Sequence, residues 1–190
     1  MVNFVLNGQW DVTGIAPDGK EMHLNGTVPG SALNDVLCSG FENITDIFWR
    51  DHAEQVQKYE TYDWVYTKRF VAESDIREGE LVFEKLDTYC DVYFNQQHLG
   101  YCDNGFVRHT FHISNIQKGE NLLEVYFYSP INQTRGKKPR KGSFTTVDRL
   151  YTRRPQCTYG WDWAMRFVTC GISGNVSIKT TEPGIKIKNA

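Results

Sequence analysis

The sequence lacks the features of several protein classes. It contains no run of about 18 apolar residues, so no transmembrane helix is expected. Its first residues carry neither a basic segment nor a sustained apolar one, so no signal peptide is predicted and the compartment stays unknown. The net charge is −2, which gives no global attraction to nucleic acid or to a membrane surface.

Cysteines and histidines are few and scattered. The five cysteines are an odd number, and no two of them form a Cys-x-x-Cys pair. This pattern argues against a disulfide framework and a zinc site, and favours free, mostly buried thiols. Among the five histidines, His109 and His112 fall on opposite faces of a predicted strand and cannot easily chelate together. No metal or other cofactor is therefore predicted.

Motifs of common enzyme classes are missing as well. The sequence has no Gly-x-Ser-x-Gly, no His-Glu-x-x-His and no phosphate-binding glycine loop. Retaining glycosidases need two carboxyl groups about 5 Å apart. Asp162 and a glutamate would be the candidates here, but the chain contains no Asn-Glu or similar pair on a barrel strand.

What the sequence does contain is a series of short strands of alternating polarity. The 190 residues are enough for one domain with a substantial core, and aromatic residues make up 14%, which suits a β-rich, carbohydrate-facing protein. Leu123, Val125 and Phe127, for example, share one face of a predicted strand. The predicted strands lie near residues 6–12, 21–28, 62–71, 81–100 (two strands with a hairpin at 95–98), 108–113, 123–127 and 174–179. This pattern predicts an all-β fold, a jelly-roll-like β-sandwich.

Helical signals are short. Leu33, Val36 and Leu37 recur at helical spacing, with Ser31 as the expected N-cap and Gly40 as the expected end. A second short helix is predicted over residues 146–152, and a turn of helix between residues 49 and 59. We therefore expect one or two short helices beside the sandwich.

A basic run interrupts the pattern at residues 135–141, where five of seven residues are Arg or Lys. A site for nucleic acid or for an acidic polysaccharide is one interpretation of such a run. A solvated loop is favoured instead, because no aromatic residue interleaves the basic ones. No nucleic-acid partner and no membrane partner are predicted.

The candidate ligand-binding residues lie within residues 156–171, where Trp161 and Trp163 flank Asp162. An indole can cover the apolar face of a pyranose ring, and a carboxylate can accept hydrogen bonds from its hydroxyls. Arg166 could hold the carboxylate of Asp162 or bind another hydroxyl. Residue types alone favour a simpler interpretation, in which the indoles pack against the protein and Asp162 caps a turn.

This stretch resembles the Gly-Trp-Asp-Trp-Gly loop of family 2 glycoside hydrolases of the β-mannosidase type, with Ala164 in place of the last Gly. The resemblance extends from Trp10 to about Lys179 and includes residues 27–30, 63–70 and 86–100. It implies a galactose-binding-like, sugar-binding domain at the start of such an enzyme. The two catalytic glutamates of that family lie in a downstream barrel, which these 190 residues lack.

The resemblance also implies roles for the residues of this stretch. Trp161 and Asp162 match residues that reach from the sugar-binding domain into the active site and contact the substrate. Tyr159 and Arg166 would support them, and Trp163 completes the set of substrate-binding candidates. The expected partners are a terminal β-mannoside or other glycan, and the downstream domains of the parent enzyme.

Two alternatives stay open at this stage. The chain could be a stand-alone, lectin-like carbohydrate-binding module, or the equivalent domain of a β-galactosidase or β-glucuronidase. Whether the chain itself counts as an enzyme is likewise undecided. Its domain is expected over residues 1–182, followed by an exit linker at residues 183–190.

Overall fold

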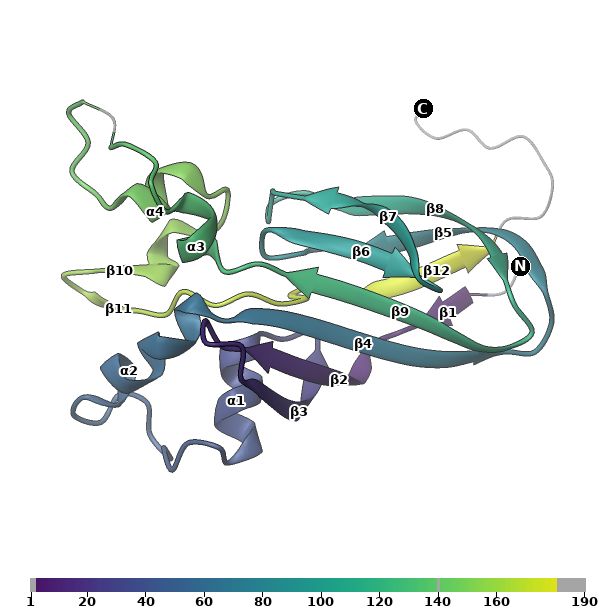
Figure 1. The fold of residues 1–190 in the computed structure, drawn as a ribbon, viewed down its shortest axis with the longest axis horizontal. Helices are drawn as coiled ribbons and strands as arrows, with labels where there is room; N and C mark the ends of the chain where they lie inside the picture. The colour runs from purple at the N-terminus through teal and green to yellow at the C-terminus, as the bar shows by residue number, and fades with distance from the viewer. Residues whose placement is uncertain (1–2, 140, 181–190) are drawn as a thin grey trace.

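The computed structural model describes residues 3–139 and 141–180, which fold mainly into antiparallel strands (Figure 1). Two larger sheets form the layers of a sandwich, as the alternating strands predict. The first has six strands in the order β3 (Glu21–Val28), β2 (Gly8–Ile15), β4 (Asp63–Ala72), β9 (Gly119–Phe127), β6 (Cys90–Phe94) and β7 (Gln97–Cys102). The second has four, in the order β1 (Asn3–Val5), β12 (Val176–Thr180), β5 (Ile76–Phe83) and β8 (His109–Ile116).

The core lies between these sheets and follows the period-two pattern of the strands. In β9, Leu123, Val125 and Phe127 are all fully buried, and the side chains between them are half-buried. Trp64 and Tyr66 point the same way from the neighbouring strand β4. Burying these large apolar side chains is the main source of stability in such a domain. The all-β sandwich is therefore confirmed.

Some strands differ from the sequence prediction. The hairpin after residue 94 is confirmed, with Asn95 and Gln96 both at positive φ (46° and 68°) as a tight two-residue turn requires. Residues 81–100, however, touch three strands rather than two, because β5 begins at Ile76 and ends at Phe83. The short strand β1 was not predicted, and it places β12 inside its sheet rather than at the edge.

The helix α1 (Ala32–Ser39) begins and ends where its capping residues indicate. The Ser31 side chain accepts a hydrogen bond from the backbone N–H of Asn34, and Gly40 adopts the left-handed conformation. Asp35 ties this helix to the first sheet, since its carboxylate accepts hydrogen bonds from the Thr27 N–H (3.0 Å) and the Tyr66 hydroxyl (2.8 Å). Burial raises the pKa of Asp35.

Most of the remaining elements gather at one end of the sandwich, at the left of Figure 1. They are the helices α2 (His52–Gln55), α3 (Pro130–Thr134) and α4 (Val147–Tyr151), and the two-stranded sheet of β10 (Tyr159–Trp161) and β11 (Ala164–Arg166). Two 3-10 turns, η1 (Val56–Thr61) and η2 (Gln156–Thr158), complete the helical segments.

No helix among the described residues is long and apolar enough to span a membrane. The predicted linker at residues 183–190 lies outside the described residues.

Candidate functional site

The stretch with the two tryptophans is a small hairpin. Tyr159 pairs with Arg166 and Trp161 pairs with Ala164, so Asp162 and Trp163 form the two-residue turn between β10 and β11. Gly160 has φ = 79°, and a Cβ there would lie 3.1 Å from the Cβ of Arg166, so glycine suits this position. The sequence indicates an irregular loop here, and the structure shows a turn held by two short strands.

The tip of this hairpin is exposed. Trp161 keeps 51% of its surface accessible and Trp163 keeps 77%. Asp162 between them is also exposed, and it makes no hydrogen bond or ion pair with any described residue. Exposing two indoles costs free energy that core packing would have gained. Neither tryptophan is a core residue, whereas the position of Asp162 in a turn agrees with the simpler interpretation.

One face of the Trp161 indole is occupied by a cation. The guanidinium carbon of Arg149, in α4, lies 5.1 Å from the ring centroid. Arg149 is itself held by a hydrogen bond from its Nε to Oε1 of Gln156 (3.2 Å). A cation over an indole face is attractive, so this contact limits the orientations that the exposed ring can adopt.

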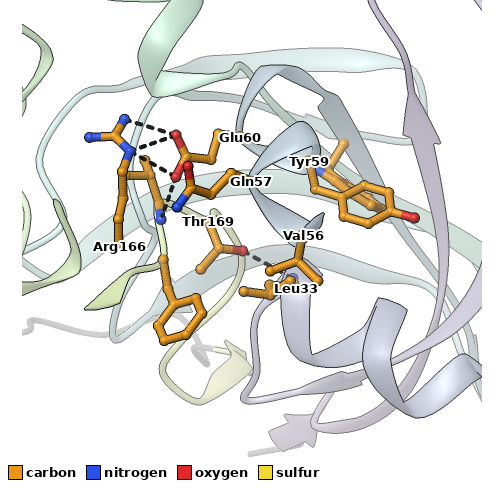
Figure 2. Close-up of a pocket in the computed structure, with 10 residues that line it drawn as sticks. Leu33, Val56, Gln57, Tyr59, Glu60, Arg166 and Thr169 are labelled. Atoms are coloured by element: carbon orange, nitrogen blue, oxygen red, sulfur yellow. Dashed lines mark hydrogen bonds and ion pairs between the residues drawn. The ribbon is translucent and has the colours of Figure 1, made fainter. Parts of the chain in front are cut away.

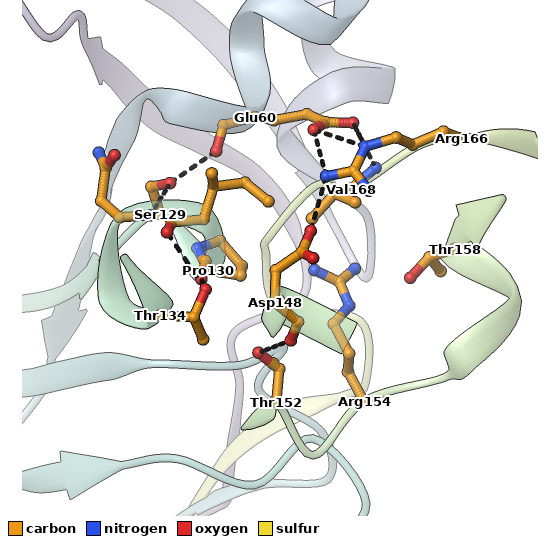
Figure 3. Close-up of polar contacts among 12 residues, drawn as sticks. Glu60, Ser129, Pro130, Thr134, Asp148, Thr152, Arg154, Thr158, Arg166 and Val168 are labelled. Carbon is orange, nitrogen blue, oxygen red and sulfur yellow. Dashed lines mark hydrogen bonds and ion pairs between the residues drawn. The ribbon is translucent and has the colours of Figure 1, made fainter. Parts of the chain in front are cut away.

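Arg166, at the base of the hairpin, pairs with two carboxylates from distant parts of the chain. Its Nη2 lies 2.8 Å from Oε2 of Glu60, in η1, and 2.8 Å from Oδ2 of Asp148, in α4. Figure 3 shows the guanidinium between the two groups. Of the two options that the sequence left for Arg166, the structure does not show the one in which it holds Asp162, because its carboxylate partners are Glu60 and Asp148. The ion pairs attach the hairpin to the helical end of the domain.

The pKa values of this network reflect its partial burial. Burial raises the pKa of Glu60, and Arg166 only partly offsets that effect. For Arg166, burial acts to lower the pKa, but the hydrogen bonds to Glu60 and Asp148 outweigh it and the pKa is raised. The guanidinium is therefore charged at all accessible pH values and compensates two carboxylates at once.

Tyr159 lies on the inner side of the hairpin, where it is 6% exposed. Two guanidiniums lie near its ring, that of Arg154 at 5.7 Å and that of Arg166 at 5.6 Å from the centroid. Burial raises the pKa of Tyr159 to about 12. The buried ring packs on the inner side of the hairpin, while Trp161, Asp162 and Trp163 present the exposed surface.

The hairpin does not enclose a sugar pocket. The cavity behind it has a volume of about 10 Å³ and is lined by Glu60, Arg166, Val168 and Thr169, among others (Figure 2). That is room for at most a single water molecule. A sugar could therefore meet the hairpin tip only as one wall of a site. The described residues also include no cluster of three metal-ligating side chains.

Replacing Arg166 with methionine should lower the free energy of unfolding by about 2 kcal/mol at pH 7, because Glu60 and Asp148 would stay close together without their cation. Losing the cation raises the pKa of both carboxyl groups in the folded state. Carboxyl groups with a raised pKa in the folded state destabilise the variant as the pH rises and they become charged. The stability deficit of the variant should therefore be smaller at pH 4 than at pH 7. Urea unfolding at both pH values measures this.

A suitable control is Arg69→Met, which removes an exposed ion pair with Glu120 and should cost less than about 1 kcal/mol. An Arg166→Met deficit as small as that of the control, or one that grows on acidification, would contradict the proposed support of the hairpin.

Comparison with known proteins identifies the family of the chain. The profile described as "Glycosyl hydrolase 2 galactose-binding domain-like" matches residues 10–174. The chain belongs to this family. The resemblance seen in the sequence, and the galactose-binding-like sandwich it implies, are thereby confirmed.

The chain is similar in sequence to several β-mannosidases. The chain is 28% identical to "Beta-mannosidase" of Capra hircus over 94% of its own length, and 26% identical to "Probable beta-mannosidase" of Caenorhabditis elegans over 91%. The structure is similar to the crystal structure of β-D-mannosidase from Dictyoglomus thermophilum, with a TM-score of 0.81 and 30% identity over 95% of the chain. It shares only the fold with a β-galacturonidase from Eisenbergiella tayi, at 17% identity and a TM-score of 0.56.

The chain spans about a fifth of the length of these relatives, namely 22% of the Capra hircus protein and 23% of the Dictyoglomus thermophilum chain. It is thus a galactose-binding-like domain of the family 2 glycoside hydrolase type, similar above all to that part of β-mannosidases.

Proposed function

We propose that this chain is the sugar-binding domain of a retaining glycoside hydrolase that acts on terminal β-mannosides. Asp162 accepts hydrogen bonds from hydroxyls of the terminal sugar, and Trp161 forms a wall of the pocket beside it. Trp163 extends the apolar surface of the tip. Tyr159 and Arg166 hold the hairpin in place from inside the domain.

The observation that carries this proposal is the state of Asp162. Its carboxylate is exposed and without a partner among the described residues, between two exposed indoles, on a hairpin fixed by the Arg166 ion pairs. A carboxylate acceptor beside apolar ring faces is the combination that a pyranose requires. The similarity to β-mannosidases, rather than the geometry, supports mannose as the sugar.

The catalytic step belongs to other domains in this proposal. Hydrolysis with retention needs a nucleophile and an acid/base carboxyl group about 5 Å apart. Asp162 is assigned to substrate binding, and both catalytic groups are assigned to the parent enzyme outside residues 1–190. One wall of a site buries little of a small ligand, so the 190-residue chain should bind free mannose weakly or not at all.

Hydrolysis of a panel of aryl β-glycosides tests the proposal, using the longest product of the gene beside the 190-residue chain. We expect β-mannoside hydrolysis by the long product and none by the short chain. Activity only on a β-galactoside or a β-glucuronide would instead identify the parent enzyme as a β-galactosidase or a β-glucuronidase. Inactivity on every glycoside would favour a lectin-like binding module, for which a glycan array is the direct measurement.

A further inference from the structure

A second feature of the helical end is a polar groove of about 400 Å³. It lies where the end of β7 meets α3 and α4, and it is larger by far than the cavity behind the hairpin. Its volume falls within the range of about 300–1,000 Å³ that small-molecule sites occupy. The groove can therefore hold one or two sugar rings.

The groove is separated from the Trp-Asp hairpin by the helix α4. Asp148 and Arg149 reach the hairpin, through the ion pair with Arg166 and the contact with the Trp161 ring. Leu150 and Tyr151, the next two residues of the same helix, line the groove. The two surfaces thus have different sets of residues and can be altered independently.

Three tyrosines contribute to the walls of the groove, and two of them are already ordered. They are Tyr89, which is buried, Tyr101 and Tyr151. The Tyr89 hydroxyl donates to the backbone oxygen of Tyr151 (2.9 Å), and the Tyr151 hydroxyl donates to that of Lys138 (2.9 Å). These bonds fix two rings, while Tyr101 stays 52% exposed. A preformed wall lowers the ordering cost of binding.

The groove also carries a net positive charge. Lys137 lies over the ring of Tyr151 with its Nζ 5.0 Å from the centroid, and no carboxylate of the described residues pairs with it. Arg153 and Asp103 also line the groove and face each other at 3.3 Å, but both side chains are more than half exposed, so the pair is weak. Two cations and one carboxylate leave one net positive charge.

This arrangement changes the interpretation of the basic run at residues 135–141. No aromatic residue interleaves the run in the sequence, which favours a solvated loop. The fold supplies the aromatic residues from elsewhere, since Tyr151 comes from α4 and Tyr101 from β7. Lys137 is therefore a cation over the ring of Tyr151 rather than one charge of a free loop.

We propose that this groove binds an anionic saccharide, a sugar whose ring carries one carboxylate. The exposed ring of Tyr101 covers the apolar face of the sugar, Lys137 and Arg153 bind the carboxylate, and Gln133 and Asp103 bind hydroxyls. A single carboxylate matches the single net charge of the groove. A long polyanion is disfavoured, because the whole chain carries a net charge of −2.

Titration of the ¹⁵N-labelled 190-residue chain with methyl galactopyranosiduronate, a monosaccharide with one carboxylate, tests this site when it is followed by amide chemical shifts. The methyl ester of the same sugar serves as a matched ligand without charge. We expect shifts at residues around the groove, and at least about tenfold weaker binding of the ester. Equal binding of the two ligands, or shifts confined to the hairpin, would overturn the proposal. Shifts of the same size with inorganic phosphate would show that the groove binds anions in general, and would overturn the proposal that its ligand is a saccharide.

Two variants separate the groove from its surroundings. Lys137→Gln should weaken binding of methyl galactopyranosiduronate about tenfold, whereas Lys141→Gln removes the same charge from the same basic run outside the groove and should change it less than about twofold. Tyr101→Ala should weaken both ligands, because the ring face is lost. Asp162→Ala should leave binding unchanged, so failure here is distinguishable from failure of the mannoside site. Equal effects of the two lysine variants would contradict the proposal.

Discussion

Replacing Asp162 with alanine in the full-length enzyme should lower kcat/KM on a β-mannoside about 30- to 1,000-fold, equivalent to about 2–4 kcal/mol. This is the loss expected when a carboxylate that accepts bonds from two hydroxyls is removed from the transition state. Initial rates at low substrate concentration give the ratio directly. Asp162→Asn should lie between alanine and the native residue, because the amide keeps one acceptor oxygen.

The structure makes this loss separable from a folding defect. Asp162 is exposed at the hairpin tip and bonds no described residue, so its removal should leave the melting temperature unchanged. Glu73→Ala is the matched control, since Glu73 is an exposed carboxylate in the turn after β4, at the other end of the sandwich (Figure 1). An Asp162→Ala enzyme with unchanged kcat/KM would refute the assigned role.

The sandwich could be predicted because its strands, turns and helix caps are indicated by residues that lie close together in the sequence. Alternation in β9, the turn at Asn95 and the caps of α1 each depend on residues close in sequence. Short elements gave weaker signals. β1, β10 and β11 have only three residues each, too few for a period to be recognised. The exposed tip of the hairpin followed from the family resemblance and not from its residue types.

The contacts that hold the site could not be predicted from the sequence. Arg166 pairs with Glu60, which lies 106 residues away, and nothing local distinguishes this carboxylate from the other acidic residues. The cation over Trp161 comes from a five-residue helix, and the cation beside Tyr151 from a run that looks like a solvated loop. In each case the tertiary fold brings the two partners together, and their separation in the sequence does not indicate the contact.

The same limit applies to Arg154, whose replacement has the largest expected effect on stability. Its side chain is fully buried, although arginine is rarely so. The guanidinium donates to the backbone oxygen of Thr169 (2.5 Å) and to Oδ2 of Asp87 (3.0 Å), and it faces the Tyr159 ring. It therefore joins the segment before the hairpin to two separate parts of the sandwich.

Arg154→Met should lower the free energy of unfolding by about 3–5 kcal/mol, because it leaves the carboxylate of Asp87 nearly buried without its cation. For a domain of this size, that corresponds to a fall in melting temperature of roughly 6–20 °C. Thermal and urea unfolding of the 190-residue chain measure both quantities.

The neighbouring arginine supplies the control for this prediction. Arg153 is 65% exposed in its side chain, and its ion pair with Asp103 spans 3.3 Å, so Arg153→Met should cost less than about 1 kcal/mol. Combining Arg154→Met with Asp87→Asn removes the unpaired charge and should restore part of the lost stability, which a double-mutant cycle quantifies. If both single arginine variants unfold alike, or if the double variant is no better than Arg154→Met alone, the buried ion pair does not hold this end of the domain together.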